Sequence, residues 1–172
     1  MRTLIATVLA SATLAVPAFA ATEPDGRGRV TVSFVAAESF TDAALDDSQR
    51  ESSRTTVLDA LRDTLVAAAE ASLPAGQRLS ITVTDIDLVG RIRPVPSLQN
   101  ERIRLLDEVS WPRVTLSYAV TGEDGGAVAA ANDVVVENRS YLVAPSPGLT
   151  DDPLRHEKAM LRRWVQATFA AR

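Results

Sequence analysis

The strongest constraint on the fold is a strict alternation of apolar and hydroxyl side chains. Residues 79–84 alternate between Leu, Ile or Val and Ser or Thr, which is the period of two expected of a β-strand with one buried face. Similar alternation recurs at residues 30–34, 114–120 and 128–136. The chain therefore has to build a sheet with one apolar face and one face rich in Ser and Thr.

The alternation changes phase within the strand predicted over residues 79–88. If it continued unbroken, Asp85 and Asp87 would point into the core and the apolar residues beside them would point outward. Two buried carboxylates without partners are costly. We therefore predict a β-bulge near Thr84 or Asp85 that redirects these side chains.

Two amphipathic helices are available to cover the apolar face. The first is predicted to begin near Asp47 and to end at Pro74, and the second is predicted over residues 154–170. Each carries its apolar residues on one stripe. Trp164 lies on the stripe of the second helix, whereas His156 sits among charged neighbours and is predicted to face solvent.

The order of these elements predicts an α+β fold. We expect a two-layer sandwich, in which a mostly antiparallel sheet has two helices packed on one face. The first two strands flank a helix and are predicted to be parallel neighbours. Residues 91–100 contain two prolines and are predicted to be a loop, followed by a short strand over 102–106. The last two strands should form an antiparallel hairpin, interrupted at Asn132-Asp133.

The N-terminus has the features of a secretory signal peptide. Arg2 precedes an apolar run of about 13 residues, and Ala18-Phe19-Ala20 is a small-x-small cleavage site. The run is too short to span a bilayer, which takes roughly 20 residues. We therefore predict a protein that is periplasmic or secreted. The predicted parts are a signal peptide over 1–20, a flexible lead over 21–28 and a single domain over 29–172.

Composition narrows the classes of function further. The chain has no cysteine, which excludes disulfides, thiolate catalysis and lipid attachment after cleavage. Loss of Arg2 with the signal peptide leaves 17 basic and 22 acidic residues, a net charge of −5. We expect no binding to nucleic acid, which needs a basic surface, and no membrane insertion after cleavage.

Asp85 and Asp87 are the sharpest candidates for a site. Carboxylates two residues apart on an extended chain lie on the same side. They are suited to a cationic partner, to Ca²⁺ or to acid/base chemistry on a glycan. The structural alternative is that they pair with Arg91, Arg104 or Arg113 at the strand end.

Four further residues complete the set of candidate binding residues. Glu38 and Asp42 follow the first strand and are expected near Asp85 and Asp87, either as an acidic rim or as solvated loop acids. Trp111 and Arg113 either stack on a ligand, or Trp111 covers the core. No Gly-x-Ser-x-Gly elbow is present and His156 is the only histidine. We therefore assign no catalytic residue, metal site or cofactor.

Four motifs distributed over nearly all of the chain after residue 28 are similar to those of a known family. They are Val30–Phe34 with Glu38, Phe40 and Asp42; Leu73–Gly76 leading to Thr84–Leu88 and Gly90; Trp111–Arg113; and Glu157–Leu161 with Trp164 and Phe169. On these motifs the chain resembles the exported bacterial proteins catalogued as domain of unknown function 3016. The resemblance implies a single domain in the bacterial envelope and supplies no catalytic residues.

Two hypotheses for function follow from these observations. The first is a non-catalytic envelope module that binds an envelope protein, a peptide or a cell-wall component. It is motivated by the absence of a nucleophile–base set, by the open Ser/Thr face and by the acidic strand end. The alternative is a hydrolase of an envelope substrate that uses Asp85 or Asp87 together with Glu38 or Asp42.

Overall fold

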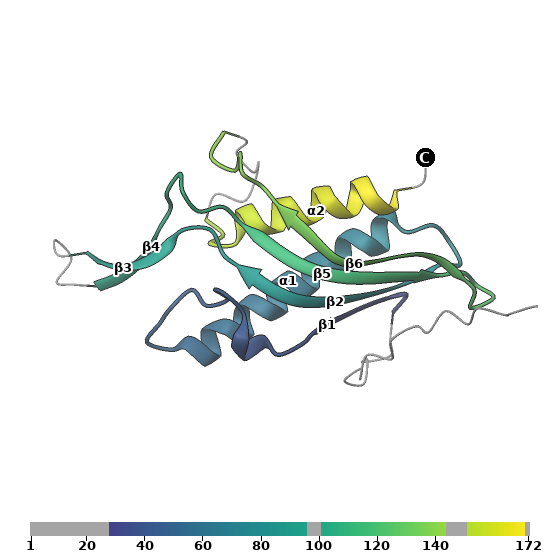
Figure 1. Ribbon diagram of the computed structural model, residues 1–172, viewed down its shortest axis with the longest axis horizontal. Coiled ribbons are helices and arrows are strands. Elements are labelled where there is room, and N and C mark those ends of the chain that lie inside the picture. The colour runs from purple at the N-terminus through teal and green to yellow at the C-terminus, as the bar shows by residue number, and fades with distance from the viewer. Residues whose placement is uncertain (1–27, 96–100, 144–150, 171–172) are drawn as a thin grey trace, which may run out of the picture.

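The computed structural model describes residues 28–95, 101–143 and 151–170 (Figure 1). A four-stranded mixed sheet has both long helices on one face, so the predicted α+β class is confirmed. The predicted signal peptide and residues 21–27 of the lead lie outside the described residues. The elements are β1 (Val30–Phe34), η1 (Ala37–Ser39), α1 (Arg50–Ser72), β2 (Arg78–Asp87), β3 (Arg91–Val95), β4 (Glu101–Leu105), β5 (Arg113–Thr121), β6 (Ala127–Glu137) and α2 (Arg155–Phe169).

The sheet has the strand order β1-β2-β5-β6. β1 runs parallel to β2 in the register Val32↔Ile81, and β5 is antiparallel to both β2 and β6. The predicted parallel crossover through α1 and the predicted closing hairpin are both confirmed. Because β1 and β6 are the outer strands, each leaves one row of backbone groups without a strand partner.

The core lies between the apolar face of the sheet and the two helices. Ile81 of β2, Leu116 of β5, Leu61 of α1 and Leu161 of α2 are all fully buried in one cluster. On the opposite face of β2, Ser80 and Thr84 are exposed. The alternation in the sequence therefore predicted both the face that the helices cover and the face that stays open.

The pairing of the long strands has three register shifts, and two of them fall where the sequence predicts an irregularity; the third lies between Val120 and Thr121. The pairing of β2 with β5 shifts between Val83 and Asp85, which leaves Ile86 1% exposed. The pairing of β5 with β6 shifts opposite Asn132 and Asp133, where Asp133 has a φ of 52°. The first bulge turns apolar residues inward and directs the aspartates of β2 away from the core.

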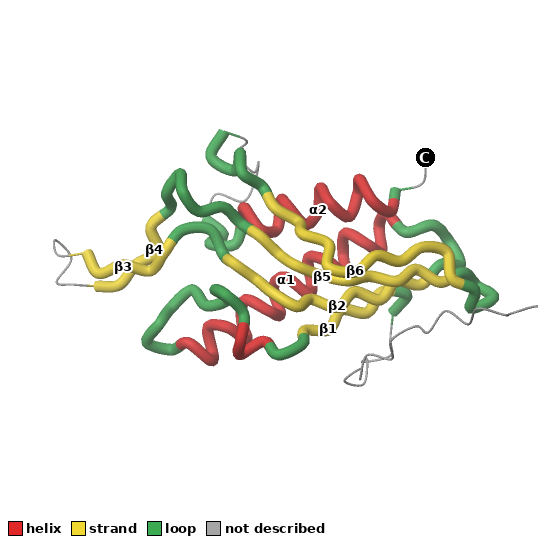
Figure 2. The backbone as a smooth tube through the Cα atoms, in the orientation of Figure 1, coloured by secondary structure: helices red, strands yellow, loops and turns green. Residues whose placement is uncertain are grey.

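The prediction of a loop over residues 91–100 is wrong for its first half. Residues 91–95 form β3, which pairs antiparallel with β4 in a separate two-stranded sheet. We call β3 and β4 the arm; Figure 2 shows it projecting from the end of the main sheet. Pro94 is compatible with this pairing because a two-stranded ribbon leaves an outer edge on each strand that needs no donor.

The prediction for His156 is also wrong. This residue lies in the first turn of α2 and is 6% exposed, and Glu157 beside it is 1% exposed. The helix stripe through Leu161 and Val165 extends back by four residues to Glu157, so helical periodicity, and not the charge of the neighbours, decides burial here. No helix in the described ranges combines the length and hydrophobicity needed to cross a membrane.

Candidate functional site

The loop between β1 and α1 brings its acidic residues to the end of β2. Asp42 forms an isolated parallel bridge with Asp87. Its N–H donates to the carbonyl of Ile86 at 2.8 Å, and its carbonyl accepts from the N–H of Leu88 at 3.0 Å. The sequence therefore placed Asp42 correctly beside the aspartates of β2, at one edge of the sheet.

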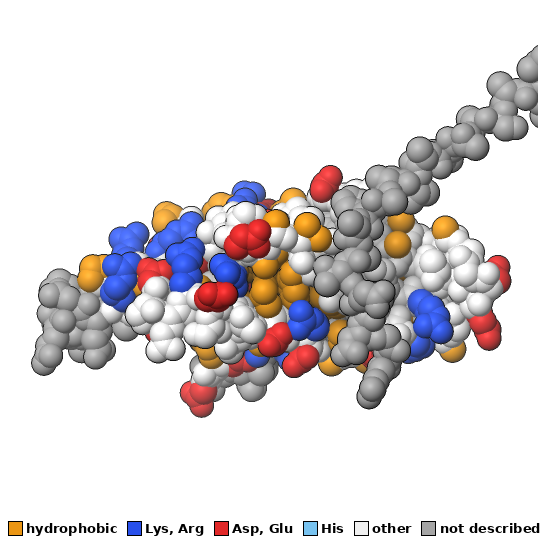
Figure 3. All heavy atoms as spheres, turned by 90° about the horizontal axis from the view of Figure 1, so that it is seen from below, with side chains coloured by type: hydrophobic (Ala, Val, Ile, Leu, Met, Phe, Trp, Pro, Cys, Tyr) orange, Lys and Arg blue, Asp and Glu red, His pale blue; other side chains and the backbone are white. Residues whose placement is uncertain are grey.

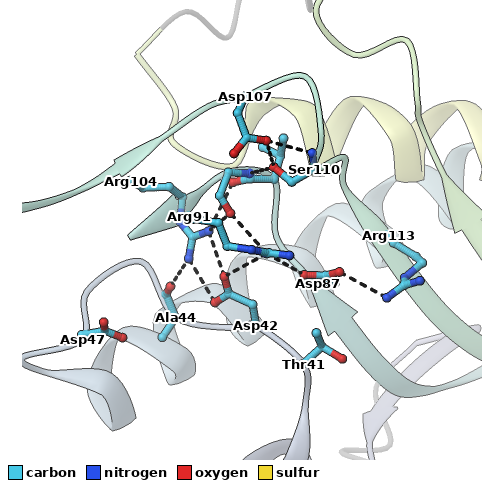
Figure 4. Close-up of polar contacts among 12 residues, drawn as sticks. Thr41, Asp42, Ala44, Asp47, Asp87, Arg91, Arg104, Asp107, Ser110 and Arg113 are labelled. Carbon is cyan, nitrogen blue, oxygen red and sulfur yellow. Dashed lines mark hydrogen bonds and ion pairs between the residues drawn. The ribbon is translucent and has the colours of Figure 1, made fainter. Parts of the chain in front are cut away.

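Arg104 of β4 joins the arm to this edge. Its guanidinium makes two 3.0 Å hydrogen bonds to the two carboxylate oxygens of Asp42 (Figure 4). It also donates to the carbonyls of Ala44 at 2.6 Å, Val89 at 3.2 Å and Gly90 at 3.0 Å. The Arg104 side chain is only 10% exposed, so its charge is held in a partly desolvated and well-bonded site.

Asp87 pairs with two other arginines. Its Oδ1 lies 3.2 Å from a guanidinium nitrogen of Arg91, and its Oδ2 lies 3.2 Å from one of Arg113. This is the structural pairing that the sequence raised as an alternative for Asp87. We call the five residues Asp42, Asp87, Arg91, Arg104 and Arg113 the arm-base cluster (Figure 4).

The remaining predicted site residues lie beside this cluster or away from it. Asp85 accepts from the N–H and the hydroxyl of Thr41 at 2.7 and 2.9 Å. Glu38 is exposed on η1 and makes no hydrogen bond or ion pair with another described residue. Trp111 donates from Nε1 to Glu137 at 2.9 Å and is covered by Arg139, not by Arg113. The arrangement therefore brings Asp42, Asp85, Asp87 and Arg113 together but leaves out Glu38 and Trp111.

A buried carboxyl on α2 binds the backbone next to the arm-base cluster. Glu157 Oε1 accepts from the N–H of Val89 at 2.9 Å, while Oε2 has no hydrogen-bond partner. Burial raises the pKa of Glu157, against the opposing effects of the Val89 hydrogen bond and nearby Arg104. Glu157 is a site residue that the sequence did not predict; the signal for it was its place on the Leu161 stripe.

A second set of polar contacts holds the chain that follows the arm. The buried Ser110 hydroxyl donates to Asp107 at 2.6 Å and accepts from the N–H of Gly90 at 3.0 Å. The hydrogen bond from the Ser110 hydroxyl lowers the pKa of Asp107. Tyr141 donates its hydroxyl to the carbonyl of Asp107, and its ring packs edge-on against His156 at 4.9 Å. Burial first, and the charge of Arg155 second, lower the pKa of His156.

The surface formed by the arm and the arm-base cluster presents arginine to solvent and keeps its acids recessed. The side chains of Arg91 and Arg113 are 46% and 39% exposed, whereas those of Asp42 and Asp87 are 18% and 14% exposed. Arg93 is exposed as well and makes no ion pair with a described residue. Figure 3, viewed from below, shows Lys and Arg side chains gathered over this end. A partner that reaches the arm meets guanidinium groups first.

The carboxylates of the site are already occupied. Both oxygens of Asp42 accept from Arg104, those of Asp87 contact two arginines, and those of Asp85 accept from Thr41. An acid/base pair needs a carboxyl that can exchange a proton with its substrate. Among the described residues there is also no group of three or more His, Asp or Glu side chains placed to hold a metal ion. The aspartates of the site thus serve as acceptors for arginine and threonine within the fold.

Comparison with known proteins places this chain in a family. No match to it was found among curated proteins or among solved structures. Residues 28–167 match the family described as "Protein of unknown function (DUF3016)". The matched range contains every strand of the sheet, the arm, α1 and most of α2. The chain belongs to the family of proteins of unknown function DUF3016.

Proposed function

We propose that this chain is exported to the bacterial envelope and acts there as a non-catalytic binding module. Its recognition surface is the arm end, defined as the arm together with the arm-base cluster. The observation that carries this proposal is the arrangement of exposed arginines over recessed, ion-paired aspartates. Exposed guanidinium groups attract a partner of opposite charge, while the recessed acids fix where those groups point.

The chemistry of the surface around the arginines favours a protein partner with an acidic face. Leu105 and Leu106 are about two-fifths exposed, at 41% and 40%, and Val109 is 81% exposed. Arginine beside solvent-exposed apolar side chains is typical of protein interfaces. Residues 91–110 contain no aromatic side chain on which a sugar ring would stack. We therefore favour an acidic envelope protein over a cell-wall glycan.

The hydrolase hypothesis gains no support from the geometry. It requires Asp85 or Asp87 to work with Glu38 or Asp42, and each oxygen of these three aspartates already accepts a hydrogen bond or an ion pair. Glu38 makes no contact with them. Freeing Asp42 or Asp87 would break an ion pair with an arginine of the arm.

A site-specific crosslink tests the proposed recognition. A photoreactive amino acid at Val109 should capture an acidic protein in living cells. The yield of this crosslinked adduct should fall as the ionic strength rises, because salt screens the attraction between the partners. Arg93→Glu should abolish the adduct at little cost to the melting temperature, because Arg93 is exposed and makes no ion pair with a described residue. Arg78→Glu, at the opposite end of β2, is the matched control and should leave the adduct intact. An adduct that ignores both salt and the charge at position 93 would refute the proposal.

A further inference from the structure

A groove opens beside β6, on a surface that the arm end does not use. It has a volume of about 330 Å³ and lies between the C-terminal half of β6 and α2. Met160, Trp164 and Ala167 of α2 line one side, and Val136 of β6, whose side chain faces the helices, lines the other. Figure 1 shows α2 running alongside β6 at this edge. The groove is thus a mainly apolar channel between a helix and a strand.

The strand that borders the groove has a free edge. β6 is the outermost strand of the sheet, so every second residue directs its backbone N–H and C=O away from β5. After the bulge at Asp133 the register is regular from Val134 to Glu137. No proline or lysine interrupts this stretch, although these are residues that commonly protect an edge strand from pairing.

The groove has one acidic and one basic residue on its rim, and only the acidic one has partners within the described residues. Glu137 already accepts from Arg139 Nε at 2.8 Å and from Trp111 at 2.9 Å, and these hydrogen bonds lower its pKa. Arg163 lines the groove from α2 and makes no ion pair with any described residue. The rim therefore offers one uncompensated positive charge beside an apolar floor.

We propose that this groove binds an extended peptide segment of a partner protein by strand addition to β6. The peptide backbone pairs with Val134–Glu137, and an apolar side chain enters between Trp164 and Val136. A carboxylate on the same peptide pairs with Arg163. An unpaired edge strand next to a helix supplies what this mode of recognition uses: backbone hydrogen bonds for affinity and a pocket for alternate side chains for specificity.

The test is selection of binding peptides by the full-length processed protein. A phage-displayed random heptapeptide library should yield sequences in which an apolar residue is flanked by Asp or Glu. Arg163→Glu should weaken a selected peptide by at least about tenfold and shift new selections toward Lys and Arg. Arg162→Glu is the matched control: it changes the adjacent residue of α2, which does not line the groove, and should leave affinity within about threefold of the parent.

Two further arms identify the mode of binding. N-methylation of alternate backbone nitrogens of the selected peptide should abolish binding, because strand addition requires those donors. Ala167→Trp should fill the groove and block the peptide while leaving the melting temperature unchanged, since Ala167 is exposed. Arg93→Glu should not affect the peptide, which separates this site from the arm end.

Three results would overturn the proposal. They are a library that yields no enriched sequence, a selected peptide whose affinity is indifferent to both Arg163→Glu and Ala167→Trp, or full affinity after N-methylation. A concentration-dependent dimer in sedimentation equilibrium that Ala167→Trp abolishes would assign the groove to a second copy of this chain instead.

Discussion

At the scale of single residues, Arg104 connects more of the molecule than any other side chain at the arm end. It makes five hydrogen bonds, to Asp42 and to the carbonyls of Ala44, Val89 and Gly90. Arg104→Met keeps the apolar stem but removes both hydrogen bonds to Asp42 and the donor to the carbonyls of Ala44 and Val89, while the carbonyl of Gly90 keeps a 3.4 Å hydrogen bond from Arg91. We expect the free energy of unfolding to fall by about 3–5 kcal/mol, measured by urea denaturation.

The control for Arg104 is another arginine–aspartate pair. Arg62 lies 2.5 Å from Asp59, but the two side chains are 42% and 57% exposed. Arg62→Met should therefore cost only about 0–1 kcal/mol. Equal losses in the two variants would mean that the buried pair contributes no more than a surface pair, and that the arm is held by other contacts.

His156 should make the stability of the protein fall in mild acid. Burial lowers its pKa below the usual value of 6.5, so the unfolded chain binds a proton more readily than the folded chain. Stability is then complete above pH 6.5 and declines as the pH falls below that value. His156→Leu should remove this decline, whatever constant offset the change in packing adds.

The measurement is urea denaturation of both proteins between pH 7.5 and 5. The difference between them isolates His156, because neighbouring Glu157 titrates in both; its raised pKa has the opposite sign and favours the folded state as the pH falls. A wild-type curve parallel to that of the variant over this range would contradict the assignment of His156 as a buried neutral imidazole.

Residue-level prediction from the sequence succeeded where a local rule fixed the outcome. The cost of burying Asp85 and Asp87 predicted the bulge, and the need for a cationic partner predicted the pairing of Asp87 with Arg91 and Arg113. Arg104 was one of three possible partners, and only the tertiary fold selects Asp42 for it. His156 failed because polar neighbours in the sequence do not report which stripe of a helix is buried.

At the scale of elements, the arm depends on one glycine where it leaves the main sheet. Gly90 has a φ of 79°, and a Cβ placed there would lie 2.4 Å from the carbonyl oxygen of Leu105. Gly125 has a φ of 78°, and a Cβ there would meet nothing within 4 Å. The two glycines therefore have nearly the same positive φ. They differ in that β4 lies close to Gly90, whereas no atom lies close to Gly125.

This pair separates backbone strain from steric contact. Gly125→Ala should destabilise the protein by about 1–2 kcal/mol, the usual cost of a left-handed conformation for a residue with a Cβ. Gly90→Ala should cost a further 1–3 kcal/mol or so, because β4 has to move. Thermal unfolding of the two variants gives the comparison. Equal shifts in melting temperature would mean that β4 can move away from residue 90 without a measurable loss of stability.

The strands of the main sheet and the two long helices were predictable because the spacing of apolar residues in each matches its secondary structure. Strands β1, β2, β5 and β6 carry the alternation of apolar and polar residues, and α1 and α2 carry helical stripes. The arm lacks such a signal. β3 contains Pro94, and as part of a two-stranded ribbon beside the core it has no buried face whose side chains would alternate. Its partner β4 was identified, but its pairing with β3 was not.

At the scale of the whole molecule, the fold places its two proposed recognition surfaces at edges of the sheet. The helices occupy one face of the sheet, and the two proposed surfaces lie at the strand ends and along β6. The arm end is rich in exposed arginine, and the groove adds Arg163. The chain as a whole is acidic, with a formal charge of −4. Local placement of the basic residues, which composition alone conceals, therefore directs both proposals toward acidic partners.

The proposed function places the protein outside the cytoplasm, and its N-terminus provides the test. Expressed in a bacterial host, the full chain should appear in the periplasmic fraction with Ala21 as its first residue, as read by N-terminal sequencing. Replacing Ala18 and Ala20 together by Tyr should block cleavage and leave a membrane-associated precursor, because the peptidase requires small residues at those two positions.

Phe19→Tyr is the matched control for that double variant. It introduces the same side chain at the position between the two alanines, which the cleavage pattern leaves unrestricted, so it should be processed like the parent. Loss of residues 1–20 also removes Arg2 and no acid, which raises the net negative charge of the secreted form by one. Recovery of the parent from the cytoplasm with an intact N-terminus would contradict export, and with it the assignment of the arm end to an envelope partner.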